Sequence, residues 1–181
     1  ATKTLSVNNN FTFSASGGLA PYSYSIISGG GSINSSTGAF TAPASAGTVV
    51  LRVTDTLSQV SNSTVTVNAA LAISPAAVTL AINNTTTFSA TGGVSPYTYS
   101  IVSGGGSINA TSGAFTAPAT AGSVVVRVTD SLSNSSNSTV TVNPAISISP
   151  AAITLAVNNV ATFLASGGVS PYSYSIVSGG G

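Results

Sequence analysis

The chain repeats itself every 75 residues, and this period limits its possible folds more than any single side chain does. The segment Ser95–Gly106 recurs with small changes at Ala20–Gly31 and at Ser170–Gly181. Exchanges between the copies, such as Val for Ile or Ser for Thr, preserve side-chain volume and β propensity. A chain built from such repeats usually supplies length, spacing or many equal binding points rather than one chemical pocket.

The composition excludes most catalytic and metal-binding chemistry. Only 3% of the 181 residues are charged, and His and Cys are absent. Asp55 and Asp130 are the only acidic side chains, one in each of the first two copies. Paired-carboxylate catalysis, nucleophilic catalysis and transition-metal binding need groups that this inventory does not bring together, and calcium sites need several acidic oxygens. We therefore predict a protein that is not an enzyme and that has no metal and no cofactor.

Charge and hydropathy also limit the partners. A net charge of +1 offers no electrostatic attraction for nucleic acid or for an anionic membrane. Mean hydropathy is +0.47, but no apolar run approaches the ~18 to 20 residues of a membrane-spanning helix. We expect no nucleic-acid partner and no membrane insertion. So few charges indicate a surface covered by neighbouring subunits or glycan, although ordinary secreted stalk domains can be equally uncharged.

Apolar residues alternate with polar or small ones through most of the chain, as at Val124, Val126 and Val128. This period of two predicts about seven short strands in each repeat, and two sheets must pack face to face to bury the apolar sides. The predicted core of the second repeat is Leu80, Ile82, Phe88, Tyr99, Ile101, Ile108, Phe115, Val124, Val126, Val128, Val140 and Val142, with counterparts 75 positions earlier.

Three segments, Gly92–Ser100, Gly113–Pro118 and Ala121–Asp130, carry a family resemblance. They occur in the order typical of the bacterial immunoglobulin-like (Big) tandem-repeat domains of surface proteins and adhesins, which the whole chain resembles. The resemblance implies an all-β fold of tandem immunoglobulin-like β-sandwich domains in an extracellular or cell-surface protein. Tyr99 takes the place of the core aromatic residue on strand C. The Cys pair and Trp of antibody domains are missing, so no vertebrate-type immunoglobulin function is implied.

The repeat period predicts three domains: a first repeat at 1–68, a complete second repeat at 69–143 and a partial third repeat at 144–181. The connectors between them are too short for flexible linkers, so we expect a semi-rigid array. The first copy lacks the strand that Leu71–Pro75 represents in the second copy, and the third copy contains only its first strands. Two expectations stay open: neighbouring chains complete both copies by strand addition, or the chain is a window on a longer repetitive protein.

Five side chains are candidates for contacts between domains or subunits. Tyr22, Tyr97 and Tyr172 each follow a proline at the expected end of a domain, where a ring can pack on the adjacent domain or stack on a sugar. Arg52 and Arg127 are the only cations of their repeats outside Lys3 and are candidates for an intersubunit bond. We expect Asp130 to cap the turn that follows it rather than to pair with Arg127, because residues three apart on a strand point to opposite faces.

Asn-X-Ser/Thr sequons provide candidate glycosylation sites, which a surface filament of suitable origin could use as a sugar coat in place of charge. The candidates are Asn10, Asn34, Asn62, Asn84, Asn109, Asn134 and Asn137.

Three functions fit these observations. The first is a structural extracellular filament or cell-surface stalk, whose partners are copies of itself and whose cohesion comes from strand pairing and domain packing. The second is an adhesin that binds host or cell-surface glycan, or protein, through repeated weak contacts. The third is a passive spacer of a larger secreted enzyme.

Overall fold

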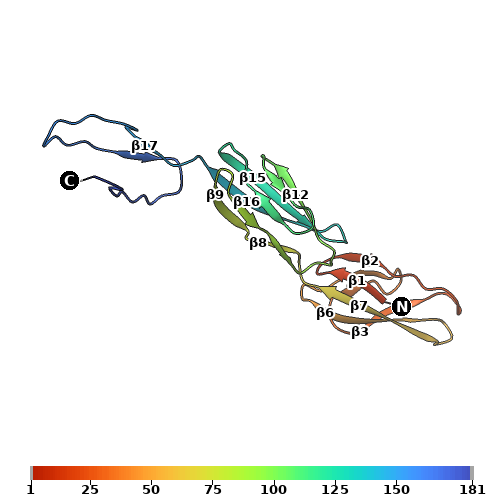
Figure 1. Cartoon of the computed structure of the whole chain (residues 1–181). Coiled ribbons are helices and arrows are strands. Elements are labelled where there is room, and N and C mark those ends of the chain that lie inside the picture. The colour runs from red at the N-terminus through yellow and green to blue at the C-terminus, as the bar shows by residue number, and fades with distance from the viewer. Residues whose placement is uncertain (1, 180–181) are drawn as a thin grey trace. The chain divides into compact units, whose positions relative to one another are not determined.

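The computed structural model describes residues 2–179, and their regular secondary structure consists entirely of β-strands (Figure 1). This confirms the predicted all-β fold. By its internal contacts the chain divides into two compact units. One comprises Ala1–Ala72, Ala90–Tyr97 and Thr129–Ser135, and the other comprises Ile73–Ser89, Thr98–Val128 and Ser136–Gly181. The loops 90–97 and 129–135 of the second repeat therefore group with the first unit, and the repeat boundaries at 68 and 143 stay a prediction.

The first unit contains a β-sandwich of two sheets. Its strands are β1 (Thr2–Ser6), β2 (Asn10–Thr12), β3 (Ser23–Ser28), β4 (Ser32–Ile33), β5 (Ala39–Thr41), β6 (Gly47–Thr54) and β7 (Val60–Asn68). One sheet has the order β1-β7-β6-β3 and the other has the order β2-β5-β4. All neighbours are antiparallel except β1 and β7, which run parallel over the register Thr2↔Thr64 to Ser6↔Asn68.

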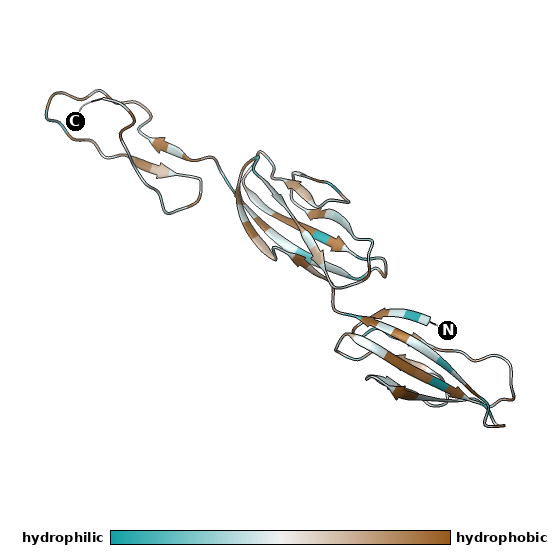
Figure 2. Cartoon of the chain, turned by 60° about the horizontal axis from the view of Figure 1, so that its bottom comes forward, coloured by the Kyte–Doolittle hydropathy of each residue, from teal (hydrophilic) through white to brown (hydrophobic). Residues whose placement is uncertain are grey.

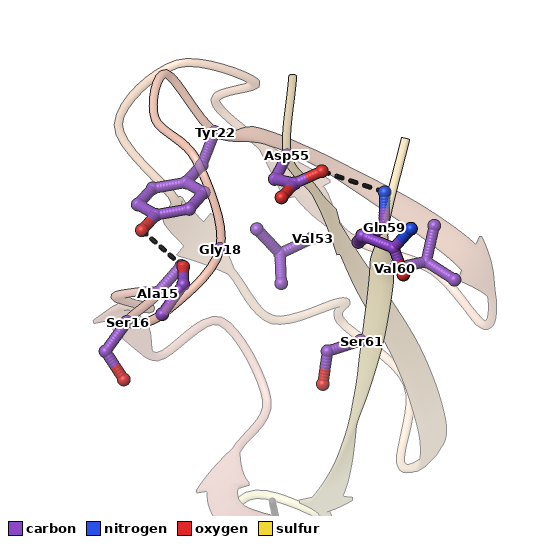
Figure 3. Close-up of a pocket in the computed structure, with 10 residues that line it drawn as sticks. Ala15, Ser16, Gly18, Tyr22, Val53, Asp55, Gln59, Val60 and Ser61 are labelled. Carbon is purple, nitrogen blue, oxygen red and sulfur yellow. Dashed lines mark hydrogen bonds between the residues drawn. The ribbon is translucent and has the colours of Figure 1, made fainter. Parts of the chain in front are cut away.

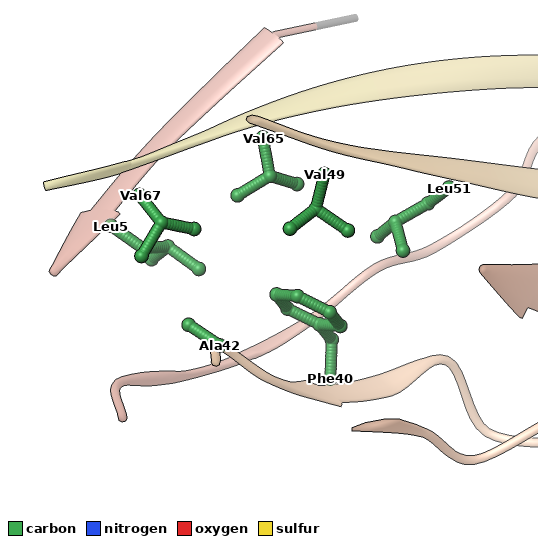
Figure 4. Close-up of a cluster of buried hydrophobic side chains, with 7 residues drawn as sticks. All are labelled: Leu5, Phe40, Ala42, Val49, Leu51, Val65 and Val67. Carbon is green, nitrogen blue, oxygen red and sulfur yellow. The ribbon is translucent and has the colours of Figure 1, made fainter. Parts of the chain in front are cut away.

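The core of this sandwich lies between the two sheets, as the strand period predicts. Phe40 projects from β5 toward the valines of β6 and β7, and every side chain of the cluster is buried (Figure 4). Its members are Leu5, Phe40, Ala42, Val49, Leu51, Val65 and Val67. Brown apolar positions alternate with pale or teal ones along the longer strands (Figure 2), which is the pattern expected when one face of each sheet is buried.

The second repeat has the same plan in nine strand segments. They are β8 (Ala72–Ser74), β9 (Ala77–Ala81), β10 (Thr85–Thr87), β11 (Ser89–Thr91), β12 (Thr98–Ser103), β13 (Ser107–Ile108), β14 (Ala114–Thr116), β15 (Gly122–Thr129) and β16 (Ser135–Asn143). The sheets have the orders β12-β15-β16-β9 and β10-β14-β13, and β8 pairs separately with β11. The segment around Phe88 is divided between two partners: β10 pairs with β14 and β11 pairs with β8. The Phe88 amide donates to the Gly113 carbonyl in register with the β10–β14 ladder, and the chain changes partner after this residue.

In the second repeat most of the predicted core is buried as expected, but four residues are corrected. Phe88, Tyr99, Phe115, Val124, Val126, Val128, Val140 and Val142 are buried, whereas Leu80, Ile82, Ile101 and Ile108 are only half-buried. The strands β9, β12 and β13 lie at sheet edges, where a side chain has a neighbouring strand on one side only, and Ile82 directly follows β9. Edge position does not decide burial alone, since Tyr99 of β12 is buried. Ile73 and Ala117 are buried although the sequence pattern did not include them.

The third repeat is represented by β17 (Ser147–Ser149) and β18 (Leu164–Ser166), which pair antiparallel. Several of its apolar side chains are exposed: Leu155 by 46%, Val157 by 90%, Phe163 by 39%, Tyr174 by 57% and Ile176 by 78%. That this repeat is partial stays a prediction. Within residues 2–179 there is no helix long and apolar enough to cross a membrane.

Candidate functional site: the loops at the repeat junctions

The connector that follows β7 lies directly on a Gly-Gly loop of the next repeat. Gly93 donates its amide to the Ala69 carbonyl at 2.8 Å. Gly92 has a φ of 68°, and a Cβ atom at this position would collide with the carbonyl oxygen of Ala70. Both the backbone conformation and the close approach of the connector therefore require glycine here.

The side chain of Asn68, at the end of β7, binds the same loop. Asn68 donates from Nδ2 to the Gly93 carbonyl at 2.8 Å. The arrangement recurs 75 residues later, where Asn143 donates to the Gly168 carbonyl at 2.5 Å and Gly168 donates to the Pro144 carbonyl at 2.7 Å. Each connector is thus held by one side-chain and one backbone hydrogen bond.

The three candidate tyrosines close the Gly-Gly loop of their own repeat. Tyr22 and Tyr97 donate their hydroxyls to the carbonyls of Gly17 and Gly92, both at 2.6 Å, and Tyr172 donates to Gly167. Each ring is half-buried. The predicted role of these rings, packing on an adjacent domain or stacking on a sugar, stays a prediction. Because the hydroxyls are bound within the loop, only the ring faces are available for such a contact.

Asp130 organises the neighbouring loop, and its predicted capping role is confirmed. One carboxylate oxygen accepts from the amides of Leu132 and Asn134 at 2.9 and 2.8 Å. The other accepts from the Val94 amide and from Asn134 Nδ2, both at 3.0 Å. Burial by itself raises the pKa of Asp130, but the hydrogen bonds from Asn134, Val94 and Leu132 outweigh it and hold the pKa below its ordinary value.

Asp55 occupies the equivalent position of the first repeat with fewer partners. It accepts from the amides of Leu19, Leu57 and Gln59 at 3.0, 2.9 and 2.8 Å. The bond from Leu19 is the largest cause that lowers the pKa of Asp55, with smaller contributions from Gln59 and Leu57 against a partial desolvation. Figure 3 shows this carboxylate beside Tyr22 and Val53.

Asn134 connects the Asp130 loop to the β1 end of the first unit. Its Nδ2 donates to Ser6 Oγ at 3.0 Å as well as to Asp130, and its Oδ1 lies 3.5 Å from Asn9 Nδ2. Ser6 is buried at 4% exposure. Asn134 was predicted as a glycosylation candidate, but its amide nitrogen already donates two hydrogen bonds in a half-buried position, which disfavours attachment of a sugar there.

The two arginines contact a neighbouring strand instead of an acid. Arg52 Nε donates to Asn62 Oδ1 at 3.1 Å, and Arg127 Nε donates to Asn137 Oδ1 at 3.0 Å. Both pairs lie on the outer face of their sheet, and the intersubunit role of the arginines stays a prediction. Asn62 and Asn137 are exposed, as are the other sequon residues apart from Asn134. Asn34 and Asn109 each accept two backbone amides through Oδ1, which shapes their turns.

No group of three or more acidic, His or Cys side chains suited to a metal ion occurs among residues 2–179. The arrangement at the junction holds backbone segments together; it brings no nucleophile and base within reach of each other. Asn68 and Asn143 were not among the predicted site residues. The available signal was their recurrence at the end of the last strand, directly before each connector.

Comparisons with known proteins place the chain by its fold. Neither a protein-family model nor a curated protein matches its sequence. Among solved structures, a C-terminal 282-residue fragment of intimin in complex with the intimin-binding domain of the translocated intimin receptor matches with a TM-score of 0.54 and 16% identity. The match covers 72% of this chain and 54% of that one, so the chain spans about half the length of this relative.

Two further matches are more distant. Mouse cadherin-23 EC22-24 has a TM-score of 0.34 and 16% identity, over 80% of this chain and 63% of that chain. The N-terminal four Ig domains of Dscam1 have a TM-score of 0.33 and 10% identity, over 80% and 43%. The intimin match and the two-sheet topology together show an immunoglobulin-like β-sandwich fold, in agreement with the predicted fold class. The specific resemblance to the bacterial Big domains is not matched by a family model.

Proposed function

We propose that this protein is a non-enzymatic, extracellular structural element, a filament or cell-surface stalk built from immunoglobulin-like repeats. The proposal rests on the hydrogen bonds that hold each connector, because the same pair of bonds occurs at Asn68 and again at Asn143. A chain that only tethers a remote domain needs no such bonds. A chain that must transmit force or keep a fixed spacing benefits from them at every repeat.

The partners that fit this function are further copies of the chain. The surface carries a net charge of only +1, so electrostatic repulsion between copies is weak. Extracellular or cell-surface localisation completes the proposal.

Electron microscopy of the purified protein tests the proposal. We expect regular fibres whose repeat distance is a multiple of one domain length, and their yield should fall when Asn68 and Asn143 are both replaced by Ala. Replacing exposed Asn84 by Ala is the matched control and should leave fibres intact. Monodisperse single chains over a wide range of concentration and salt would refute a filament.

The second candidate is an adhesin that binds glycan or protein through its repeated loops. The hollow beside Tyr22 favours it, because a half-buried aromatic ring lies there next to Asp55 and Gln59, a combination that suits a sugar (Figure 3). A glycan array distinguishes the two functions: saturable binding that is lost in Tyr22→Ala supports the adhesin, whereas fibres without glycan binding support the filament. A spacer of a larger secreted enzyme would show neither property.

A further inference from the structure

The sheet that contains the last strand of a repeat ends in a short parallel edge strand, β1 in the first repeat and β9 in the second. Among residues 2–179 no further strand pairs with either of them. Thr4 and its counterpart Thr79, at the centres of these two strands, are both exposed. The edge is therefore open in a repeat that another repeat follows, and equally in a repeat that another repeat precedes.

The hydrogen bonds at the two ends of β9 show which of its backbone groups face the open side. The Ala76 carbonyl and the Ile82 amide, which flank the strand, both bond to β16. In a parallel ladder, residues that bond to one neighbour alternate with residues that point the other way. Ala77, Thr79 and Ala81 therefore direct their amides and carbonyls away from β16, and the turn that follows the strand binds the Ala81 carbonyl.

The sequence of β9 reads almost the same in both directions. Ala77-Val78-Thr79-Leu80-Ala81 has alanine at both ends, threonine at the centre and one branched apolar residue on each side. Antiparallel pairing of two copies about Thr79 therefore sets Thr79 opposite Thr79, Val78 opposite Leu80 and Ala77 opposite Ala81. In this register the two Thr79 residues exchange both backbone bonds, and each Ala81 amide meets an Ala77 carbonyl, so a twofold arrangement satisfies the open edge.

Apolar burial favours the same pairing. Val78 lies on the inner side of the sheet, in parallel register with the fully buried Val140. Val78 itself is only half-buried, and it has a neighbouring strand on one side only. A second β9 would place its Leu80 beside Val78 on the same face, which removes further apolar surface from water. The strand has no charged residue and no proline, which are the usual protection of an edge strand against pairing.

The matching strand of the first repeat has such protection. Lys3 takes the place of Val78 and lies on the inner side of β1, in register with the buried Val65. Its ammonium nitrogen lies 4.2 Å from the centre of the Phe11 ring, which belongs to β2 of the other sheet. Pairing of two β1 strands would set Lys3 opposite Leu5 and bury an ammonium group against an apolar side chain, which costs free energy.

We propose that β9 is a pairing edge that binds β9 of a second copy of this chain, antiparallel about Thr79, and that Lys3 prevents the same contact at β1. Chains with similar edge strands in successive repeats can otherwise pair out of register, first repeat on second. A lysine in one repeat and a valine in the other removes these wrong registers. The inference rests on the proposed function only for its consequence, the lateral joining of stalks or filaments.

A second copy is the occupant that this edge fits. The strand matches itself residue by residue under a twofold axis, and it presents no charge that would select a charged partner. The net charge of +1 leaves little repulsion between two copies. A ladder of 5 residues binds weakly by itself, so we expect association at high protein concentration and a gain from avidity where many repeats align.

Cysteine cross-linking of the 181-residue protein tests the contact, because the chain has no cysteine of its own. Directly opposite residues of a hydrogen-bonded antiparallel pair have Cα atoms about 5.5 Å apart, which suits a disulfide. Under mild oxidation we expect Thr79→Cys to form a covalent dimer about tenfold faster than Thr4→Cys, which is the equally exposed counterpart in the first repeat. Equal rates for the two variants would overturn the pairing edge.

A variant of the second repeat tests whether strand pairing causes the cross-link. Val78→Lys together with Thr86→Phe rebuilds the lysine–phenylalanine pair of the first repeat in the second, so the repeat should stay folded, which thermal unfolding measures. This change should slow the cross-linking of Thr79→Cys to the rate of Thr4→Cys. Cross-linking that survives at its original rate would overturn pairing through β9.

The reverse exchange tests the role of Lys3. Lys3→Val together with Phe11→Thr gives β1 the residues of the second repeat at both positions. The cross-linking of Thr4→Cys should then rise toward that of Thr79→Cys. If it does not rise, Lys3 is not what keeps the first edge unpaired.

Sedimentation of the unmodified chain tests the second copy as the occupant. Dimers should appear reversibly as concentration rises and should be lost in the Val78→Lys, Thr86→Phe variant. A chain that stays monomeric at all concentrations would overturn the second copy as partner. Fibres that persist unchanged in the variant would overturn β9 as the joining contact and leave the proposed filament standing. Dimers through β9 without any fibres would keep the pairing edge and refute the filament.

Discussion

At the scale of single residues, Asp55 and Asp130 each accept hydrogen bonds from loop amides, but their surroundings differ. Each carboxylate gathers the amides of its own turn and one amide of the Gly-Gly loop, at Leu19 for Asp55 and at Val94 for Asp130. Asp130 is 6% exposed and gains the side chain of Asn134, whereas Asp55 is half-buried. In both repeats the carboxylate thus holds its own turn and the Gly-Gly loop together.

We expect the stability of the second repeat to depend on the ionised form of Asp130. Its folded-state pKa is lowered, so its contribution is fully present above the unfolded-state value of about 4 and is lost as pH falls through the lower folded-state pKa. Asp130→Asn should reduce the free energy of unfolding by about 1 to 3 kcal/mol at pH 7. Urea unfolding at pH 7 and pH 2 measures this, and a difference that persists unchanged at pH 2 would contradict the assignment.

The paired phenylalanines of the two repeats offer a matched test of core packing. Phe88→Ala should destabilise the second repeat by about 3 to 5 kcal/mol, because its ring is buried at 1% exposure and lies 6.0 Å from the Phe115 ring. Phe13→Ala should cost the first repeat clearly less, since Phe13 is only half-buried. Thermal unfolding followed by calorimetry gives both values, and a loss below about 1 kcal/mol for Phe88→Ala would show that the ring is not core.

At the scale of elements, strand formation depends on the partner more than on the local sequence. Ser89–Thr91 and Leu164–Ser166 form strands beside β8 and β17, whereas Ser14–Ser16 do not. The three segments differ little in β propensity. Pairing therefore decides, because an unpaired three-residue segment gains too few hydrogen bonds to offset its loss of backbone entropy.

Detaching β8 should make the second repeat resemble the first. Ile73→Asp places a charge among buried apolar groups, so β8 should leave β11 while the remaining sandwich stays folded. Hydrogen exchange is the measurement: amides of Ser89–Thr91 should then exchange about as fast as those of Ser14–Ser16. Ala72→Asp, at an exposed neighbouring position, is the control and should leave exchange unchanged. Protection that survives Ile73→Asp would show that β11 is stable without its partner.

At the scale of the whole molecule, the scarcity of charge is one reason to expect that neighbouring subunits or sugars cover part of the surface. Copies of the chain cover it in the proposed filament, and sugars on sequons provide a second means. The exposed candidates are Asn10, Asn34, Asn62, Asn84, Asn109 and Asn137, while Asn134 is engaged by Ser6 and Asp130.

Intact mass spectrometry of protein isolated from its native source tests the sugar coat. We expect extra mass that maps to exposed sequons such as Asn109, and none on Asn134, because its Nδ2 already donates two hydrogen bonds. Protein expressed in a host without glycosylation is the control and should show the polypeptide mass alone. A native mass equal to the polypeptide would remove the sugar-coat hypothesis.

Much of the fold could be predicted from the sequence, because it depends on local or repeated features. The 75-residue period, the alternation at Val124, Val126 and Val128, and the capping role of Asp130 need only neighbouring residues, and each agrees with the structure. The hydrogen bonds of the candidate site could not be predicted in this way. Asn68 and Gly93 lie 25 residues apart, and the alternation pattern contains no information about which loop a strand end will meet.

The sequence by itself determined that this protein is all-β and built on a 75-residue repeat, since period and alternation are properties of the chain. Only the tertiary structure decided which alternating residues are fully buried, because Leu80 is half-buried whereas Leu5, at the equivalent position of the first repeat, is buried. It likewise decided the parallel pairing of β1 with β7. These features arise from contacts between distant segments, whose geometry is set by the packing of two sheets rather than by local sequence.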